Sequence, residues 1–157
     1  MFYNFIYADD LHHWVCTTSV ITHNKSDVLV MDSLGKTCQI SHSLEQQIAQ
    51  VYGGGRSQLT VHSLSVQQQV GVKDCGLFAV AFAVELCQKH DPSQVSYDQR
   101  KMRAHFISCL QKEHLVTFPR GQRLQEKIPR PKGQTFTILV RNQRQKKKLA
   151  AKAKKPL

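Results

Sequence analysis

The sequence lacks the paired ligands of a zinc site. Its five cysteines are widely spread, none forms a Cys-x-x-Cys pair, and none of its eight histidines accompanies a cysteine at zinc-finger spacing. No apolar run is as long as a membrane-spanning helix, and the opening MFYNFIYADD lacks the basic start of a signal peptide. We therefore expect an intracellular chain with free thiols, without metal, other cofactor or membrane contact.

Acidic residues are nearly missing from the last quarter of the chain. From Arg120 to Leu157, 13 lysines and arginines face one acid, whereas residues 1–119 hold 9 basic and 10 acidic side chains. We predict a nearly neutral domain over 1–119 and a basic, disordered tail over 120–157. The final run RNQRQKKKLAAKAKKPL suits a solvated tail, a nuclear localisation signal or an arm that contacts nucleic acid without sequence preference, so a nuclear location is suspected.

Hydrophobic periodicity divides residues 1–119 into strands and helices. We predict strands at 14–21, 28–32 and 59–66, and helices at 43–52, 76–89 and 97–115. The turn THNKSD joins the first two strands into a hairpin. Residues 135–140 are a candidate for one more short strand. This order indicates a domain of the α+β or mixed α/β class and no repeat.

Four residues have the chemistry of cysteine-based acyl transfer. Cys75 lies where the polar stretch QQQVGVKD meets an apolar helix, and a helix start favours a thiolate. His13, at a strand start, is a candidate base that takes the thiol proton. Asp32, at the end of the next strand, is placed to orient the imidazole. Gln69 is a candidate amide donor to an oxyanion.

Each of these residues also has a simple structural explanation. A free cysteine at the start of a buried helix is usually a small packing residue. A histidine beside a tryptophan on a strand usually packs or lies on the surface, and Asp32 before Ser33 suits a turn. Gln69 merely ends a run of three glutamines. The combination therefore carries the hypothesis, and no single residue does.

The ordered set of motifs resembles the ubiquitin-like-protein protease family, which includes the SUMO-specific proteases and the adenovirus maturation protease. The motifs are His13-Trp14, then VMDSL at 30–34, then the stretch from Gln69 to DCG at 74–76. His12 is a rival base, but only His13 directly precedes the tryptophan. The resemblance implies an α+β, papain-like cysteine protease fold of the adenain type, with a central mixed sheet and the nucleophile at the start of a buried helix.

The same resemblance implies a role for each residue. His13 would be the general base, Asp32 its orienting partner and Cys75 the nucleophile. Gln69 and the Cys75 N–H would form the oxyanion hole, and Trp14 would be a wall of the substrate channel. The implied activity is a cysteine-type peptidase or isopeptidase that cleaves after a small-residue C-terminal motif. Its partner would be a ubiquitin-like modifier, a modifier conjugate or a polyprotein.

Two departures from the family leave a second reading open. The turn at 70–73 has its glycine shifted by one place, and only 12 residues precede His13, where family domains carry a sizeable segment. Residues 1–119 would thus match the C-terminal part of a catalytic domain. Residues 97–119 resemble the tail helix of stand-alone, transposon-associated members of the family. The alternative function is a catalytically silent module that binds a ubiquitin-like modifier. A nucleic-acid-binding role would explain only the tail.

Overall fold

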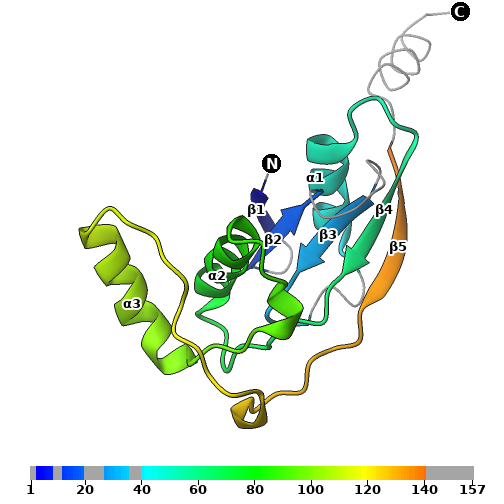
Figure 1. Ribbon diagram of the computed structural model, residues 1–157. Coiled ribbons are helices and arrows are strands. Elements are labelled where there is room, and N and C mark those ends of the chain that lie inside the picture. Colours follow the sequence, from blue (N-terminus) through cyan, green and yellow to red (C-terminus); the bar gives the residue numbers. More distant parts are fainter. Residues whose placement is uncertain (1–2, 9–11, 20–26, 36–39, 141–157) are drawn as a thin grey trace, which may run out of the picture.

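One mixed β-sheet runs through the middle of the protein (Figure 1). The computed structural model describes residues 3–8, 12–19, 27–35 and 40–140. The strands lie side by side in chain order: β1 (Tyr3–Ala8), β2 (His13–Thr18), β3 (Asp27–Met31), β4 (Gln58–Ser63) and β5 (Gln134–Leu139). Neighbouring strands are antiparallel except β3 and β4. Because parallel neighbours need a crossover, α1 (His42–Tyr52) connects these two.

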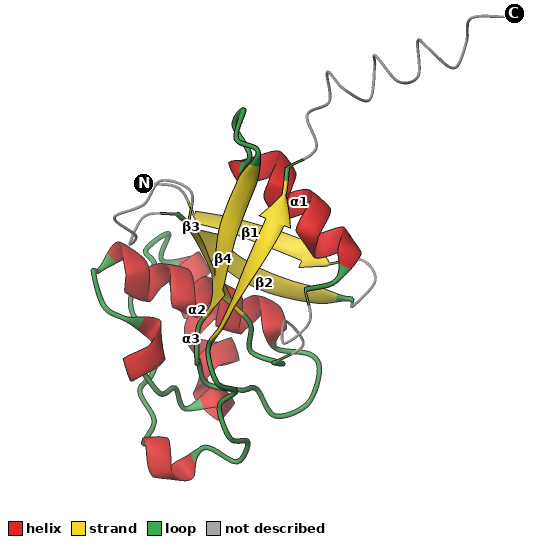
Figure 2. Ribbon diagram, turned by 90° about the vertical axis from the view of Figure 1, so that its right-hand side faces the viewer, coloured by secondary structure: helices red, strands yellow, loops and turns green. Residues whose placement is uncertain are grey.

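Two helices cover opposite faces of the sheet, as Figure 2 shows. Successive strand residues point to opposite faces, so Val15 and Val30 pack with α1, whereas Cys16 and Met31 pack with α2 (Cys75–Cys87). Nine of the 13 residues of α2 are buried, which explains why its sequence is apolar on every side. The described residues therefore form a small α+β fold with a five-stranded mixed sheet and three α-helices.

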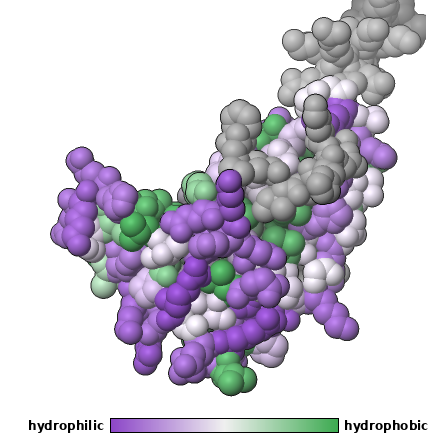
Figure 3. Space-filling model, viewed as in Figure 1, coloured by the Kyte–Doolittle hydropathy of each residue, from purple (hydrophilic) through white to green (hydrophobic). Residues whose placement is uncertain are grey.

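The third helix, α3 (Gln99–Gln111), packs beside α2 and away from the sheet (Figure 1). Two short 3-10 helices, η2 (Pro92–Gln94) and η3 (Arg123–Gln125), flank it along the chain. The surface seen in Figure 3 is mostly hydrophilic, with small hydrophobic patches, and α3 itself exposes Ile107 and Leu110. In the described part of the chain, no helix is both long and apolar enough to cross a membrane.

Most predicted elements are present. β2 and β3 pair as the predicted hairpin, and the helix expected at 43–52 ends at Gly53 as predicted, although Ser41 is its N-cap. The helix expected over 97–115 spans 99–111, because the Gln67 side chain binds both backbone groups of Tyr97 and Asp98 is the N-cap. Residues 3–8, for which no element was predicted, form the edge strand β1.

The segment after Pro119 differs most from expectation. The candidate strand at 135–140 is present as β5 (Gln134–Leu139) and pairs with β4 along its whole length, so the tail expected from residue 120 does not begin there. The β-branched and aromatic stretch TFTIL favours this strand, and Ile138 is 2% exposed in the core on the α1 side. Residues 120–140 therefore belong to the fold. The basic run from 141 to 157 lies outside the described residues.

Candidate active site

His13 and Asp32 form a buried pair at one end of the β2–β3 hairpin. β2 begins at His13, and β3 ends one residue before Asp32. Because the strands are antiparallel, the start of one lies beside the end of the other. His13 Nε2 lies 2.5 Å from Asp32 Oδ1, and the residues are 0% and 2% exposed. The hairpin thus brings these two predicted site residues together.

The hydrogen bonds of this pair indicate where the histidine proton lies. Asp32 Oδ1 also accepts a hydrogen bond from the Leu34 N–H at 2.7 Å, which orients the carboxylate. An ionised carboxylate only accepts, so His13 Nε2 is the donor and carries the ring proton. In the neutral ring, Nδ1 is then an acceptor. Nδ1 is buried without a hydrogen-bond partner in the structure described, which leaves it free to accept a proton.

Cys75 is the first residue of α2 and is 8% exposed. The Phe78 N–H donates to Asp74 O at 3.0 Å, so the N–H groups of residues 75–77 have no acceptor within the helix. These N–H groups, at the positive end of the helix dipole, belong to the turn that begins with the Cys75 thiol. α2 packs against β2, although His13 Nδ1 makes no hydrogen bond to the Cys75 thiol in this structure.

Trp14 lies against the start of α2. A Cβ atom added to Gly76 would lie 3.8 Å from Trp14 Cδ1, so the indole borders the residue that follows Cys75. The tryptophan is 42% exposed, and its ring centroid is 5.1 Å from that of Tyr7. His12, the rival base, is exposed, and its Nδ1 lies 3.4 Å from the Tyr7 hydroxyl. His12 therefore faces Tyr7, whereas His13 reaches Asp32.

Gln69 is connected to the histidine–aspartate pair through Ser33. The Ser33 hydroxyl donates to Gln69 Oε1 at 2.7 Å, and the Gln69 N–H donates to the Ser33 carbonyl at 2.7 Å. Gln69 Nε2 donates one hydrogen to the Gly71 carbonyl at 2.9 Å. A glutamine amide has two such hydrogens, so one is left for a further acceptor. The side chain is 1% exposed, which holds this orientation.

No protein-family model, curated protein or solved structure matches this chain. Among the residues described, no group of three or more His, Cys, Asp or Glu side chains is placed to hold a metal ion. The site contains a thiol at a helix start, an imidazole with a free nitrogen, a buried carboxylate and an oriented amide. These are the groups that nucleophilic acyl transfer requires.

The other described cysteines lie in different surroundings. Cys16 is fully buried on β2, and this burial, with a smaller effect of Cys87, raises the pKa of its thiol to about 12. Cys16 therefore stays protonated at neutral pH. Cys109 lies on α3, with its Sγ 3.4 Å from His105 Nε2. Cys75 differs from these thiols because it starts a helix that packs on the strand of His13.

Two neighbours of Gln69 make contacts that the sequence did not predict. Gln68 Nε2 donates to the Asp32 carbonyl at 3.1 Å, and Gln67 hydrogen-bonds both backbone groups of Tyr97. Both glutamines are nearly buried, Gln67 at 5% and Gln68 at 6% exposure. Their signal in the sequence is weak, because a run of three amides gives no indication that it is buried. The run QQQ therefore connects the end of β3 to the segment before α3, and its last residue is the candidate oxyanion donor.

Proposed function

We propose that the protein is a cysteine-type peptidase or isopeptidase that uses Cys75, His13 and Asp32. The observation that carries the proposal is the buried His13–Asp32 pair, in which His13 Nδ1 has no hydrogen-bond partner. A buried polar atom without a hydrogen bond costs stability. Acceptance of a proton during the reaction would explain why this nitrogen has no hydrogen-bond partner, whereas a packing role would not explain it.

The proposed reaction has two stages. His13 Nδ1 takes the proton of the Cys75 thiol, and the sulfur attacks the carbonyl carbon of the scissile amide. The oxyanion accepts hydrogen bonds from the Cys75 N–H and the second Gln69 amide hydrogen. His13 then gives its proton to the leaving amine, and a thioester remains. Water, deprotonated by His13, attacks this thioester and releases the carboxylic acid, while the sulfur regains its proton.

The surroundings of Cys75 favour a substrate with small residues before the scissile bond. Trp14 borders Gly76, so a bulky substrate side chain would meet the indole at the start of α2. A glycine-rich tail passes such a wall most easily, because glycine has no side chain to accommodate. We propose the C-terminal tail of a ubiquitin-like modifier, or a polyprotein with a similar motif, as the substrate.

We further propose a papain-like fold of the adenain type for this domain. Its support is the order of the elements: the histidine begins β2, the aspartate directly follows the antiparallel strand β3, and the cysteine begins a buried helix packed on β2. A second candidate function is a module that binds a modifier without cleaving it. It is favoured by one observation: Cys75 is 8% exposed, so its thiol offers a substrate little surface to approach.

The test is labelling with ubiquitin and SUMO probes that carry a thiol-reactive group in place of the C-terminal carboxylate. We expect one adduct per chain, mapped to Cys75 by peptide mass spectrometry and lost in Cys75→Ala. Cys16→Ala is the matched control, because Cys16 is a buried thiol on the neighbouring strand, and this variant should still be labelled. A folded chain that binds a probe but forms no adduct would support the binding module and refute the peptidase.

A further inference from the structure

The loop that joins Gln69 to Cys75 has almost no packing of its own. Residues 70–73 are exposed, with Val72 at 70%, and a Cβ atom added to Gly71 would meet nothing within 4 Å. We call residues 70–74 the nucleophile loop. Since apolar burial does not fix this loop, its shape depends on the hydrogen bonds at its ends.

One side chain of α3 holds both ends of the nucleophile loop. Gln99 Oε1 accepts the Val70 N–H at 2.8 Å, and Gln99 Nε2 donates to the Val70 carbonyl at 2.9 Å. The same Nε2 donates to Asp74 Oδ2 at 2.8 Å. One helical turn later, Arg103 donates to the other carboxylate oxygen of Asp74 at 2.5 Å. A single amide and a single guanidinium therefore fix the distance between the ends of the loop.

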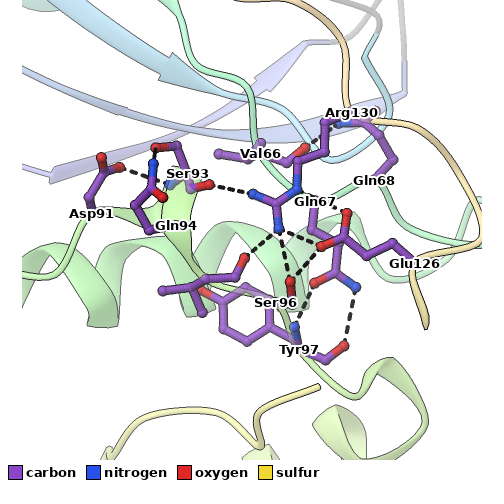
Figure 4. A network of polar contacts seen from close by, with 11 residues as sticks. Val66, Gln67, Gln68, Asp91, Ser93, Gln94, Ser96, Tyr97, Glu126 and Arg130 are labelled. Carbon is purple, nitrogen blue, oxygen red and sulfur yellow. Dashed lines mark hydrogen bonds and ion pairs between the residues drawn. The ribbon is translucent and has the colours of Figure 1, made fainter. Parts of the chain in front are cut away.

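The start of α3 is held in return by the segment before the loop. Gln67 Oε1 accepts the Tyr97 N–H at 2.6 Å, and Gln67 Nε2 donates to the Tyr97 carbonyl at 3.1 Å, as Figure 4 shows. Both residues are buried. Each segment thus presents a glutamine that pairs with the backbone of the other, so α3 and the 67–69 segment are fixed relative to one another.

Asp74 connects this arrangement to the nucleophile. It is the N-cap residue of α2, but its side chain makes no capping bond to the helix and is instead bound by α3. The loop ends on one side at the candidate oxyanion donor and on the other at the candidate nucleophile. A shift of the loop would therefore move the Gln69 amide relative to Cys75.

We infer that Gln99 and Arg103 are positioning residues, which set the geometry between Cys75 and Gln69 through the nucleophile loop. This role rests on the proposed peptidase function. A misplacement of about 1 Å costs on the order of 100-fold in rate when reacting groups must be aligned. These side chains also line a cleft of about 650 Å³ that reaches both the loop and α3. Water in the cleft therefore competes for the hydrogen bonds of Gln99 and Arg103, and the loss of one of these bonds should let the nucleophile loop move away from α3.

The test uses Gln99→Glu in the full chain. The carboxylate keeps the acceptor for the Val70 N–H but loses the donor and meets the carboxylate of Asp74. With the ubiquitin or SUMO probe that labels the wild type, we expect the maximal labelling rate to fall by about 10- to 100-fold. The half-saturating probe concentration should stay unchanged. Amide hydrogen exchange of Val70 should become faster, because repulsion by Asp74 moves the introduced carboxylate away from the Val70 N–H.

Rescue separates positioning from a general loss of structure. In the double variant Asp74→Asn with Gln99→Glu, the amide introduced at position 74 can donate to the carboxylate introduced at position 99, so the labelling rate should recover at least in part. Gln111→Glu is the matched control, because it makes the same change at the exposed last residue of α3. Arg103→Gln should slow labelling in the same way and Arg103→Lys less, whereas Arg100→Gln, at an exposed arginine that pairs with Asp98, should not.

The outcomes distinguish the two proposals. If the wild type is labelled and Gln99→Glu is labelled as fast, the positioning role is refuted and the proposed function stands. A change in half-saturation alone, or no recovery in the double variant, would likewise refute positioning. If no probe labels the folded wild type, the proposed function itself fails.

Discussion

Replacing Arg130 by methionine should destabilise the fold more than any change at the neighbouring surface arginines. The Arg130 guanidinium donates to the carbonyls of Ser93 and Val95 at 2.5 and 2.7 Å, and to the Ser96 hydroxyl at 3.1 Å. It also donates to both oxygens of Glu126, at 2.5 and 2.9 Å (Figure 4). The strand β5 begins soon after, at Gln134, so this side chain fixes the segment that leads into the sheet.

The size of the effect follows from burial. The side chains of Arg130 and Glu126 are 4% and 8% exposed. Removal of one member of such a pair leaves a poorly solvated charge and typically costs about 3–5 kcal/mol. In the Arg130→Met variant, the Ser96 hydroxyl, 2.6 Å from Glu126 Oε1, would be the one hydrogen-bond donor left to the Glu126 carboxylate among the described residues. For a domain of this size, each kcal/mol lowers the melting temperature by about 3 °C, so Arg130→Met should lose about 10–15 °C.

The effect should depend on pH. Burial would raise the pKa of Glu126, but hydrogen bonds from Arg130 and Ser96 and the charges of Arg130 and Arg123 outweigh it and lower this pKa. The folded-state pKa thus lies below the unfolded value of about 4.3. The pair therefore stabilises the fold fully above that value, and the contribution is lost as the pH falls through the folded-state pKa.

The assay is urea unfolding of wild type and Arg130→Met, followed by circular dichroism at pH 7 and at several values between about 5 and 3. The difference in unfolding free energy should be largest at pH 7 and should shrink toward pH 3. Arg123→Met is the matched control, because Arg123 is exposed in η3, and it should change stability by less than about 0.5 kcal/mol. A loss below about 1 kcal/mol in Arg130→Met, or a loss that does not vary with pH, would refute the reasoning.

Three further predictions concern other parts of the chain. Asp32→Asn should fold but lower the turnover of a cleaved modifier substrate by about 10³-fold or more, because the amide no longer fixes the His13 tautomer; unchanged turnover would exclude Asp32 from the site. Phe78→Ala should cost about 3–5 kcal/mol in urea unfolding, since its fully buried ring lies 5.9 Å from that of Phe82; a loss below about 1 kcal/mol would show that the core closes around the gap. Deletion of residues 141–157 should abolish nuclear retention of a fluorescent fusion, and an unchanged distribution would refute the localisation hypothesis.

The parts of the fold that sequence predicted depend on local patterns. The helix α2 follows from an unbroken apolar run, and the hairpin of β2 and β3 follows from two strand-like runs around a short turn. The pairing of His13 with Asp32 follows in turn, since the hairpin places a strand start beside a strand end. Each inference needs only neighbours in sequence or one short connection.

The parts that sequence did not predict depend on contacts between distant segments. β5 pairs with β4 across about 70 residues, as in Ser63 with Gln134, and no local pattern indicates that partner. Gln67 binds Tyr97 and Gln99 binds Val70 across about 30 residues. An amide side chain looks the same in a sequence whether it is solvated or pairs with a buried backbone. The contacts of Gln67 and Gln99 were therefore visible only in three dimensions.

In the proposed mechanism, Cys75 cleaves an amide bond with His13 as its base. The most direct measurement is release of aminomethylcoumarin from the C-terminal glycine of ubiquitin and of SUMO by the full chain. We predict release with at least one of these substrates and a loss of about 10³-fold or more in both Cys75→Ala and His13→Gln. Equal release by Cys75→Ala, or no release by the folded wild type with either substrate, would contradict it.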